Sequence, residues 1–183
     1  MKGSKILAGV AGLALLIAGG SAQAQSIIRN NDAHPHFEIE VHGLAGFHRG
    51  YGFGGGVRFG IPIVPSGFLS QVNDSFALSL GADFIWWAGY YGCFNSACAY
   101  SPFGIIGHID AQWNFFIHEK FSAFAEAGFA PEFYFGQGNC GFGFFCPWFD
   151  FAVGGRWHFR GNADFPTLTF RLGSTGATVG VSF

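Results

Sequence analysis

Apolar residues recur at every second position along several segments of this chain. In residues 175–183, Ala177, Val179, Val181 and Phe183 share one face of an extended strand, and small or polar residues occupy the other. A period of two is the repeat of a β-strand, whose successive side chains point to opposite sides. Comparable segments lie near 37–48, 54–64, 76–87, 105–117, 121–135, 149–159 and 167–172. The sequence therefore predicts an all-β protein with eight strands.

The composition indicates that these strands cross a membrane. Only 11% of the residues are charged, whereas a soluble domain has about 25%, and the chain contains 25 Phe and 30 Gly. After the first 24 residues no apolar run approaches the ~18 residues of a transmembrane helix. Helices and closed barrels are the structures that satisfy every backbone hydrogen bond in lipid. We therefore expect residues 37–183 to form an eight-stranded antiparallel up-and-down transmembrane β-barrel.

The charged side chains indicate which strand face points inward. On the expected strands they occupy the face opposite the Phe-rich one, so we expect the apolar face to contact lipid and the charged face to line the lumen. A soluble barrel with its apolar face inward is the competing architecture, but its water-facing surface would need many more charges. The expected polar network of the lumen comprises Glu38, Glu40, His42, Arg58, Asp83, His108, Asp110, Glu126, Glu132, Asp150, Arg156, His158 and Arg171.

The N-terminal residues have the pattern of an export signal. Lys2 and Lys5 precede an apolar stretch, residues 6–20, and small residues then allow cleavage after Ala24. We expect residues 1–24 to be removed, residues 25–36 to form a short periplasmic tail, and the barrel to lie in a bacterial outer membrane. Loss of the two lysines takes the formal charge from −2 to −4, which excludes a basic nucleic-acid-binding surface.

Breaker-rich segments separate the expected strands. Short polar connections at 65–74, 118–120 and 160–164 are assigned to the periplasmic side. The connections at 48–53, 88–102, 137–148 and 173–176 are then assigned to the outer side, and the two middle ones are long loops. Both long loops are rich in aromatic residues. The first aromatic cluster begins with Trp86 and Trp87, and the second ends with Trp148 and Phe149. These aromatics fit an interfacial girdle or a binding surface.

With these features the chain resembles small outer-membrane barrels of the OmpA, OmpX and opacity-protein kind. The resemblance is carried by the export signal, the eight alternating segments and the C-terminal run that ends in Phe183. A terminal aromatic preceded by apolar residues at alternate positions is similar to the signal read by the barrel assembly machinery. The resemblance implies that Val179, Val181 and Phe183 form this signal, and that outer-membrane lipid and the assembly machinery are partners.

Three roles remain open for the polar lumen. An eight-stranded barrel is just wide enough for side chains to fill it, which favours a structural network of paired charges. A narrow conduit for small solutes is the second possibility. The third is an enzyme, because His108 and Asp110, with Glu126 on the next strand, form a His–carboxylate set, and barrels of this kind include lipid A deacylases and acyltransferases. We expect no enzyme activity, because no serine accompanies His108 on its strand.

Four cysteines, Cys93, Cys98, Cys140 and Cys146, fall in the two long loops. Export favours disulfides, most simply Cys93–Cys98 and Cys140–Cys146, although four cysteines allow three connectivities. A zinc site with four thiolates is the alternative. We expect no cofactor and no metal ion. The predicted role is therefore structural, or one of surface interaction with an extracellular ligand or protein at loops stapled by disulfides.

Overall fold

The computed structural model describes residues 37–48, 50–69, 72–87, 93–94, 97–98, 103–118, 120–135, 145–160 and 166–183. These residues form ten β-strands. Their bounds are β1 (Glu38–Gly46), β2 (Gly52–Val64), β3 (Asp74–Trp87), β4 (Cys93–Phe94), β5 (Ala97–Cys98), β6 (Phe103–His118), β7 (Phe121–Phe135), β8 (Phe145–His158), β9 (Thr167–Gly173) and β10 (Gly176–Ser182). No described residue belongs to a helix long and apolar enough to cross a membrane.

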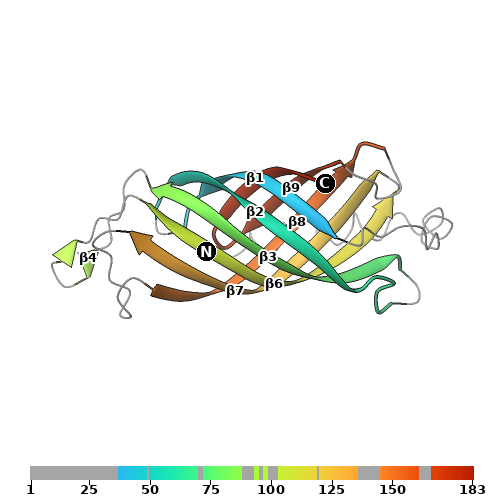
Figure 1. The fold of residues 1–183 in the computed structure, drawn as a ribbon, viewed down its shortest axis with the longest axis horizontal. Coiled ribbons are helices and arrows are strands. Elements are labelled where there is room, and N and C mark those ends of the chain that lie inside the picture. The colour runs from blue at the N-terminus through green and yellow to red at the C-terminus, as the bar shows by residue number, and fades with distance from the viewer. Residues whose placement is uncertain are drawn as a thin grey trace, which may run out of the picture.

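Eight of the strands close into one barrel, in the order β1-β10-β9-β8-β7-β6-β3-β2 (Figure 1). Each strand is antiparallel to both neighbours. The first and last strands meet at the seam, where the backbone N–H of Ile39 donates to the carbonyl of Phe183 at 3.0 Å and the N–H of Phe183 donates back at 2.8 Å. The predicted all-β, eight-stranded, up-and-down barrel is confirmed.

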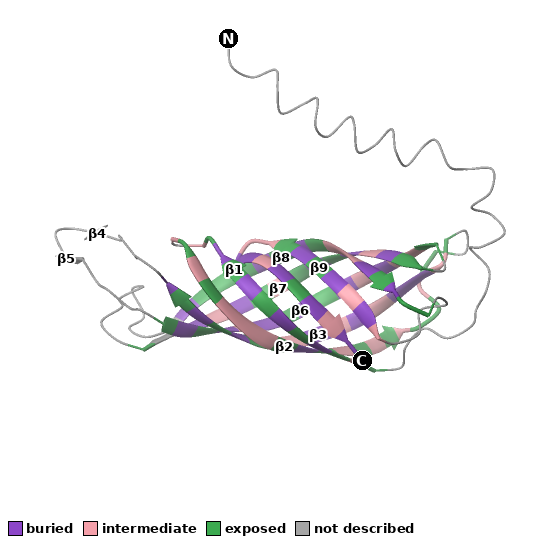
Figure 2. Cartoon of the chain, turned by 90° about the horizontal axis from the view of Figure 1, so that it is seen from above, coloured by how far each residue is buried: buried purple, intermediate pink, exposed green. Residues whose placement is uncertain are grey.

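Burial alternates along most of the length of the barrel strands (Figure 2). In β6, for example, Ile106, His108 and Asp110 are buried, whereas Ile105 and Ile109 are exposed. The alternation follows from the pleat, which turns successive side chains toward the lumen and toward the outside. Most buried side chains of the barrel are polar or charged, and many exposed ones are large and apolar. The polarity is thus the reverse of that in a water-soluble barrel.

An apolar layer fills the lumen at one end of the barrel. Its members are the buried residues Leu44, Ile85, Trp87, Ile106, Ala130 and Cys146. Glycines in the wall leave room for this layer: a Cβ at Gly46 would lie 2.3 Å from Cδ1 of Ile85, and one at Gly104 would lie 3.0 Å from the Trp87 ring. We call these six residues the apolar layer.

The connections at the two ends of the barrel differ in length. The end near the apolar layer carries the connections 88–102 and 136–144, and the first contains the two-stranded β4–β5 hairpin (Figure 1). The opposite end carries the connections between β2 and β3, β6 and β7, and β8 and β9. We call the first the loop end and the second the turn end.

The strand β3 ends at Trp87, as the predicted strand 76–87 does, so Trp86 and Trp87 belong to the strand although they were also counted with the aromatic residues of the loop. Trp86 faces outward with 51% of its surface exposed, while Trp87 points inward with 2% exposed. The assignment of residues 145–148 to a loop is wrong, because β8 begins at Phe145. Apolar residues continue on both faces there, so the pattern contains no polar residue to mark the end of the strand.

Candidate functional site

The charged lumen is the main concentration of reactive side chains among the described residues. Twelve of the thirteen residues assigned to its polar network from the sequence are at most 5% exposed. The exception is Glu38, whose side chain is 13% exposed. The twelve are Glu40, His42, Arg58, Asp83, His108, Asp110, Glu126, Glu132, Asp150, Arg156, His158 and Arg171. All are contributed by strands, because the period of two places every second side chain inside.

Arg171 joins three strands through two carboxylates. From β9 its guanidinium donates to both oxygens of Glu40 in β1, at 2.7 and 3.2 Å, and to both oxygens of Glu126 in β7, at 2.8 and 3.2 Å. Gln112 donates to Glu126 as well, at 2.8 Å. A planar guanidinium suits such two-pronged pairing, which fixes both carboxylates in position. This arrangement locks β1, β7 and β9 to one another across the lumen.

Arg156 forms a second cluster nearer the turn end. Its Nε donates to Glu38 at 3.1 Å and its Nη1 donates to the Asn114 side chain at 2.7 Å. The ring of Phe124 lies 4.5 Å from the guanidinium carbon of Arg156 and 5.1 Å from that of Arg171. Contact of a guanidinium with an aromatic face is attractive. Phe124 therefore links the two arginine clusters.

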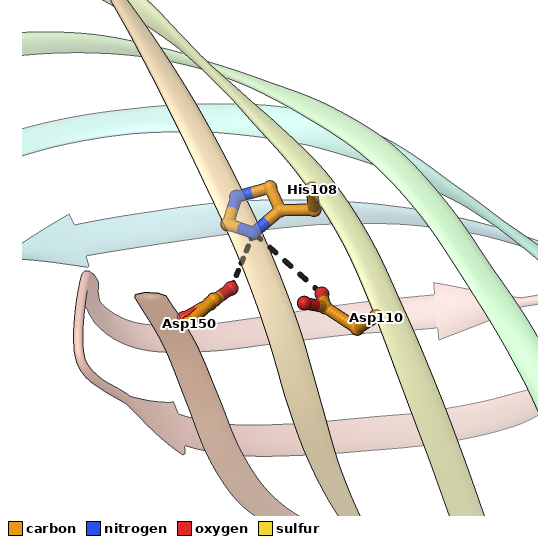
Figure 3. A group of neighbouring side chains, drawn as sticks. All are labelled: His108, Asp110 and Asp150. Atoms are coloured by element: carbon orange, nitrogen blue, oxygen red, sulfur yellow. Dashed lines mark hydrogen bonds and ion pairs between the residues drawn. The ribbon is translucent and has the colours of Figure 1, made fainter. Parts of the chain in front are cut away.

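A chain of histidines and aspartates crosses the lumen closer to the apolar layer. His42 Nε2 lies 2.8 Å from one oxygen of Asp83, and His108 Nε2 lies 3.1 Å from the other. The second ring nitrogen of His108, Nδ1, lies 2.6 Å from Asp150 Oδ2 (Figure 3). The remaining oxygen of Asp150 accepts a hydrogen bond from Ser174 Oγ at 2.6 Å. Strands β1, β3, β6 and β8 are connected in this way to the β9–β10 connection.

His108 and Asp110 do not form the His–carboxylate pair that the sequence suggested. His108 Nδ1 lies 3.9 Å from Asp110 Oδ2, and Asp110 instead accepts from Arg58 at 3.2 Å. In a serine triad the histidine lies between the serine and the carboxylate, whereas here Asp150 lies between Ser174 and His108. A Ser–His pair that the sequence did not suggest, Ser122 and His158 at 2.9 Å, is 0% and 3% exposed, so a substrate has no access to it.

The loop-end rim contains residues that interact above the apolar layer. His48 Nε2 lies 3.4 Å from Glu132, and the His48 ring lies 4.5 Å from that of Trp148. Trp87 Nε1 donates to the His48 carbonyl at 3.2 Å. These contacts bring a histidine, two tryptophan side chains and the buried carboxylate of Glu132 together at the loop end of the barrel.

The cysteines lie partly outside the described residues. Cys93 and Cys98 face each other in the β4–β5 register, Cys146 is buried in β8, and Cys140 lies outside the described residues. The expected signal peptide and tail, residues 1–36, also lie outside them. The disulfide pairings and the processing of the N-terminus stay predictions.

The expected assembly signal lies on the outer face of β10 and just after it. Val179 is 53% exposed and Phe183 is 60% exposed, whereas Val181 is partly exposed. Their neighbours on the same strand, Gly180 and Ser182, face the lumen side. These three apolar residues therefore form an accessible outward stripe next to the seam.

No protein-family model matches the chain, and no curated protein matches its sequence. The functional conclusion therefore depends on the geometry described above.

Proposed function

We propose that this protein is an integral outer-membrane β-barrel with a closed lumen, and that its role is structural or one of surface interaction through the connections at its loop end. The observation that carries the proposal is the reversed polarity of the barrel: buried charges inside and a continuous apolar surface outside. Outward residues in the middle of the strands include Val41, Ile109, Phe151, Val153, Phe170 and Val179, each between 48% and 65% exposed.

An apolar surface of this extent needs an apolar surrounding. Transfer of such side chains out of water stabilises a protein by about 25 cal/mol per Å² of apolar surface, and monomeric soluble proteins rarely expose apolar patches beyond a few hundred Å². Lipid would cover this surface on all sides of the closed barrel. The charges inside would then lie in a lumen shielded from lipid, where they pair with one another.

Aromatic contacts at both ends of the outer surface support membrane insertion. Near the loop end Phe53 stacks with Trp86, and Phe103 contacts both Phe84 and Phe135. Near the turn end Phe68 packs against Phe76 and Trp113, and Phe37 packs against Phe59. Two aromatic girdles flanking an apolar band are the usual outer surface of such barrels.

The contents of the lumen favour a structural role over a conduit. The apolar layer occupies one end, and beneath it the arginine and histidine clusters cross from strand to strand. Apolar side chains outnumber polar ones at this level of the lumen, where Glu132 lies opposite Ile106 and Cys146 in the strand register, and this favours a filled lumen over an open channel. The loop end is then the part with access to a partner, and we assign it to the cell exterior, with disulfides Cys93–Cys98 and Cys140–Cys146. The opposed register of the first pair, and the lack of a free cysteine among the described residues, support these disulfides.

The first experiment compares membrane fractions by gel mobility with and without boiling. A closed barrel in the outer membrane is expected to resist detergent unboiled, to shift on heating, and to respond to reductant through its loops. A soluble periplasmic protein without a heat shift would contradict the proposal.

A charged substitution on the outer face distinguishes a residue that faces lipid from one that faces water. Replacing Val153, which is 60% exposed in β8, by Arg (Val153→Arg) is expected to destabilise the inserted barrel by about 2–4 kcal/mol if the residue faces lipid. In water the same change would alter stability by less than about 0.5 kcal/mol. Ser66→Arg, in the exposed β2–β3 turn, is the matched control and should leave stability unchanged. Stability is measured by denaturant unfolding in lipid vesicles, and equal values for the two variants would contradict insertion.

Epitope tags test the orientation. A tag within residues 95–96, between β4 and β5, should be labelled on intact cells, whereas one within 161–165, at the turn end, should require permeabilised cells. The opposite labelling pattern would place the loop end in the periplasm.

A further inference from the structure

The lumen contains one group of side chains whose arrangement goes beyond charge pairing. His108, Asp110 and Asp150 each direct one possible ligand atom toward a common point, and these atoms all lie within 4.8 Å of one another. All three residues are at most 5% exposed. We infer that His108, Asp110 and Asp150 bind one divalent transition-metal ion of the zinc class, at a site formed by β6 and β8.

One carboxylate oxygen of Asp110 has no hydrogen-bond partner in the described protein. Asp110 is 0% exposed, and its Oδ1 makes no hydrogen bond, although Oδ2 accepts from Arg58 at 3.2 Å. Leaving a buried carboxylate oxygen unsatisfied is costly. In Figure 3 the two oxygens of Asp110 lie on the side facing His108 and Asp150. A cation at the common point would satisfy this oxygen.

Each of the three proposed ligands is held in position by a neighbouring side chain. His108 Nε2 lies 3.1 Å from Asp83, which leaves Nδ1 as the atom directed to the common point. Asp150 Oδ1 accepts from Ser174 at 2.6 Å, which leaves Oδ2, and Asp110 Oδ2 is held by Arg58, which leaves Oδ1. A histidine ligand that donates its other N–H to a carboxylate, and ligand carboxylates that are themselves hydrogen-bonded, are the usual surroundings of a metal ion.

Distances and charge also fit a metal ion. Ligands bound tetrahedrally to zinc at about 2.0–2.1 Å lie roughly 3.3 Å apart. His108 Nδ1 lies 2.6 Å from Asp150 Oδ2, and the candidate ligand atoms of the three residues all lie within 4.8 Å of one another, so changes of at most about 1.5 Å in these separations are needed to reach that geometry. A neutral imidazole with two carboxylates carries a charge of −2, which a divalent ion neutralises.

The wall of the barrel provides room at this position. Gly128 in β7 lies beside Asp110, and a Cβ there would be 2.5 Å from Asp110 Oδ1. A larger residue would occupy the space next to the unpartnered oxygen. The mixed nitrogen and oxygen ligands favour zinc or a neighbouring transition metal over magnesium or calcium, which prefer oxygen alone.

The test uses the full mature chain without an affinity tag, with His34 and His36 replaced by Gln so that the tail binds no metal. The protein is unfolded with chelator, refolded in detergent with or without an equimolar amount of Zn²⁺, and dialysed before metal analysis. We expect about one zinc ion per folded chain. The variant Asp150→Asn should retain less than about one tenth of the zinc that the parent retains. Glu38→Gln removes a lumen acid that pairs with Arg156 instead, and this control should retain zinc as the parent does.

The result that overturns the inference is equally direct. If the folded parent retains no more zinc than Asp150→Asn, or if Glu38→Gln loses zinc to the same extent, the three residues do not form a specific site. If Asp150→Asn fails to show the heat-modifiable folded form, Asp110→Asn takes its place. X-ray absorption of the zinc-loaded parent gives a variant-free answer: one imidazole nitrogen among ligands at about 2.0–2.2 Å supports the site. A shell of oxygen alone, or displacement of zinc by excess Mg²⁺, contradicts it.

Discussion

The apolar layer and the charged clusters beneath it fill the same lumen by different physical means. The apolar layer is held by close packing: Ile85 packs where Gly46 leaves space, and Trp87 packs where Gly104 does. The charged clusters are held by pairing, as in the four hydrogen bonds from Arg171 to two glutamates. Removing a methyl group from the apolar layer leaves a cavity. Removing one charge from the charged clusters leaves its partners buried and uncompensated.

We therefore expect the apolar layer and the charged clusters to respond differently to single and combined substitutions. Effects in the apolar layer depend on how much volume is removed. Effects in the charged clusters depend on whether the remaining charges still balance. Three variants with their controls test this contrast.

Arg171→Met is expected to destabilise the barrel by about 3–5 kcal/mol, because the buried Glu40 and Glu126 would lose the guanidinium that bonds both of them, which leaves His42 at 3.2 Å from Glu40 and Arg58 at 3.8 Å from Glu126. The measurement is reversible denaturant unfolding of the refolded barrel. Combining Arg171→Met with Glu40→Gln and Glu126→Gln should restore most of the loss, since no unpaired charge is then left. A triple variant as unstable as the single one would show that the cluster contributes through packing rather than charge balance.

Ile106→Ala is expected to cost about 2–4 kcal/mol, because Ile106 is 1% exposed within the apolar layer and a cavity would remain. The matched control is Ile105→Ala, one position away on the outer face and 36% exposed, which should cost clearly less. The same unfolding assay measures both. Equal losses would indicate that the apolar layer is not closely packed.

Ser75→Ala is expected to have the smallest effect, about 0.5–1.5 kcal/mol, since it removes one neutral hydrogen bond from Asn114 at 3.2 Å. Asn114 keeps its bond from Arg156 through its carbonyl oxygen. A double-mutant cycle with Asn114→Ala isolates the pair. A loss as large as that of Arg171→Met would mean that charge balance does not distinguish the clusters.

The fold and the inward face could be predicted from the sequence because both depend on a period of two. Alternation places Glu40, Asp83 and Arg171 on one face whatever the neighbouring strands are, and the closed barrel of eight strands follows from their number and composition. Charges are rare on the Phe-rich face of the strands, so this face is predicted to point outward and the charged face to line the lumen.

The partners inside the lumen could not be predicted in the same way. His108 and Asp110 are neighbours on one strand, yet the close partner of His108 is Asp150, contributed by β8. Which inward residues meet across a barrel depends on the stagger and tilt of the strands, and one strand's pattern contains neither. For the same reason Ser174, in a connection, could not be assigned to Asp150 beforehand.

The seam between β1 and β10 has a consequence for how the barrel folds. Its pairing, from Glu40 with Ser182 to Gly46 with Gly176, joins the segments farthest apart along the described strands. Contacts with such high contact order form slowly, because loop closure must precede them. Until the seam forms, β1 and β10 are open edges that can pair with other chains. Folding by successive addition of hairpins therefore leaves an aggregation-prone intermediate that only the final pairing removes.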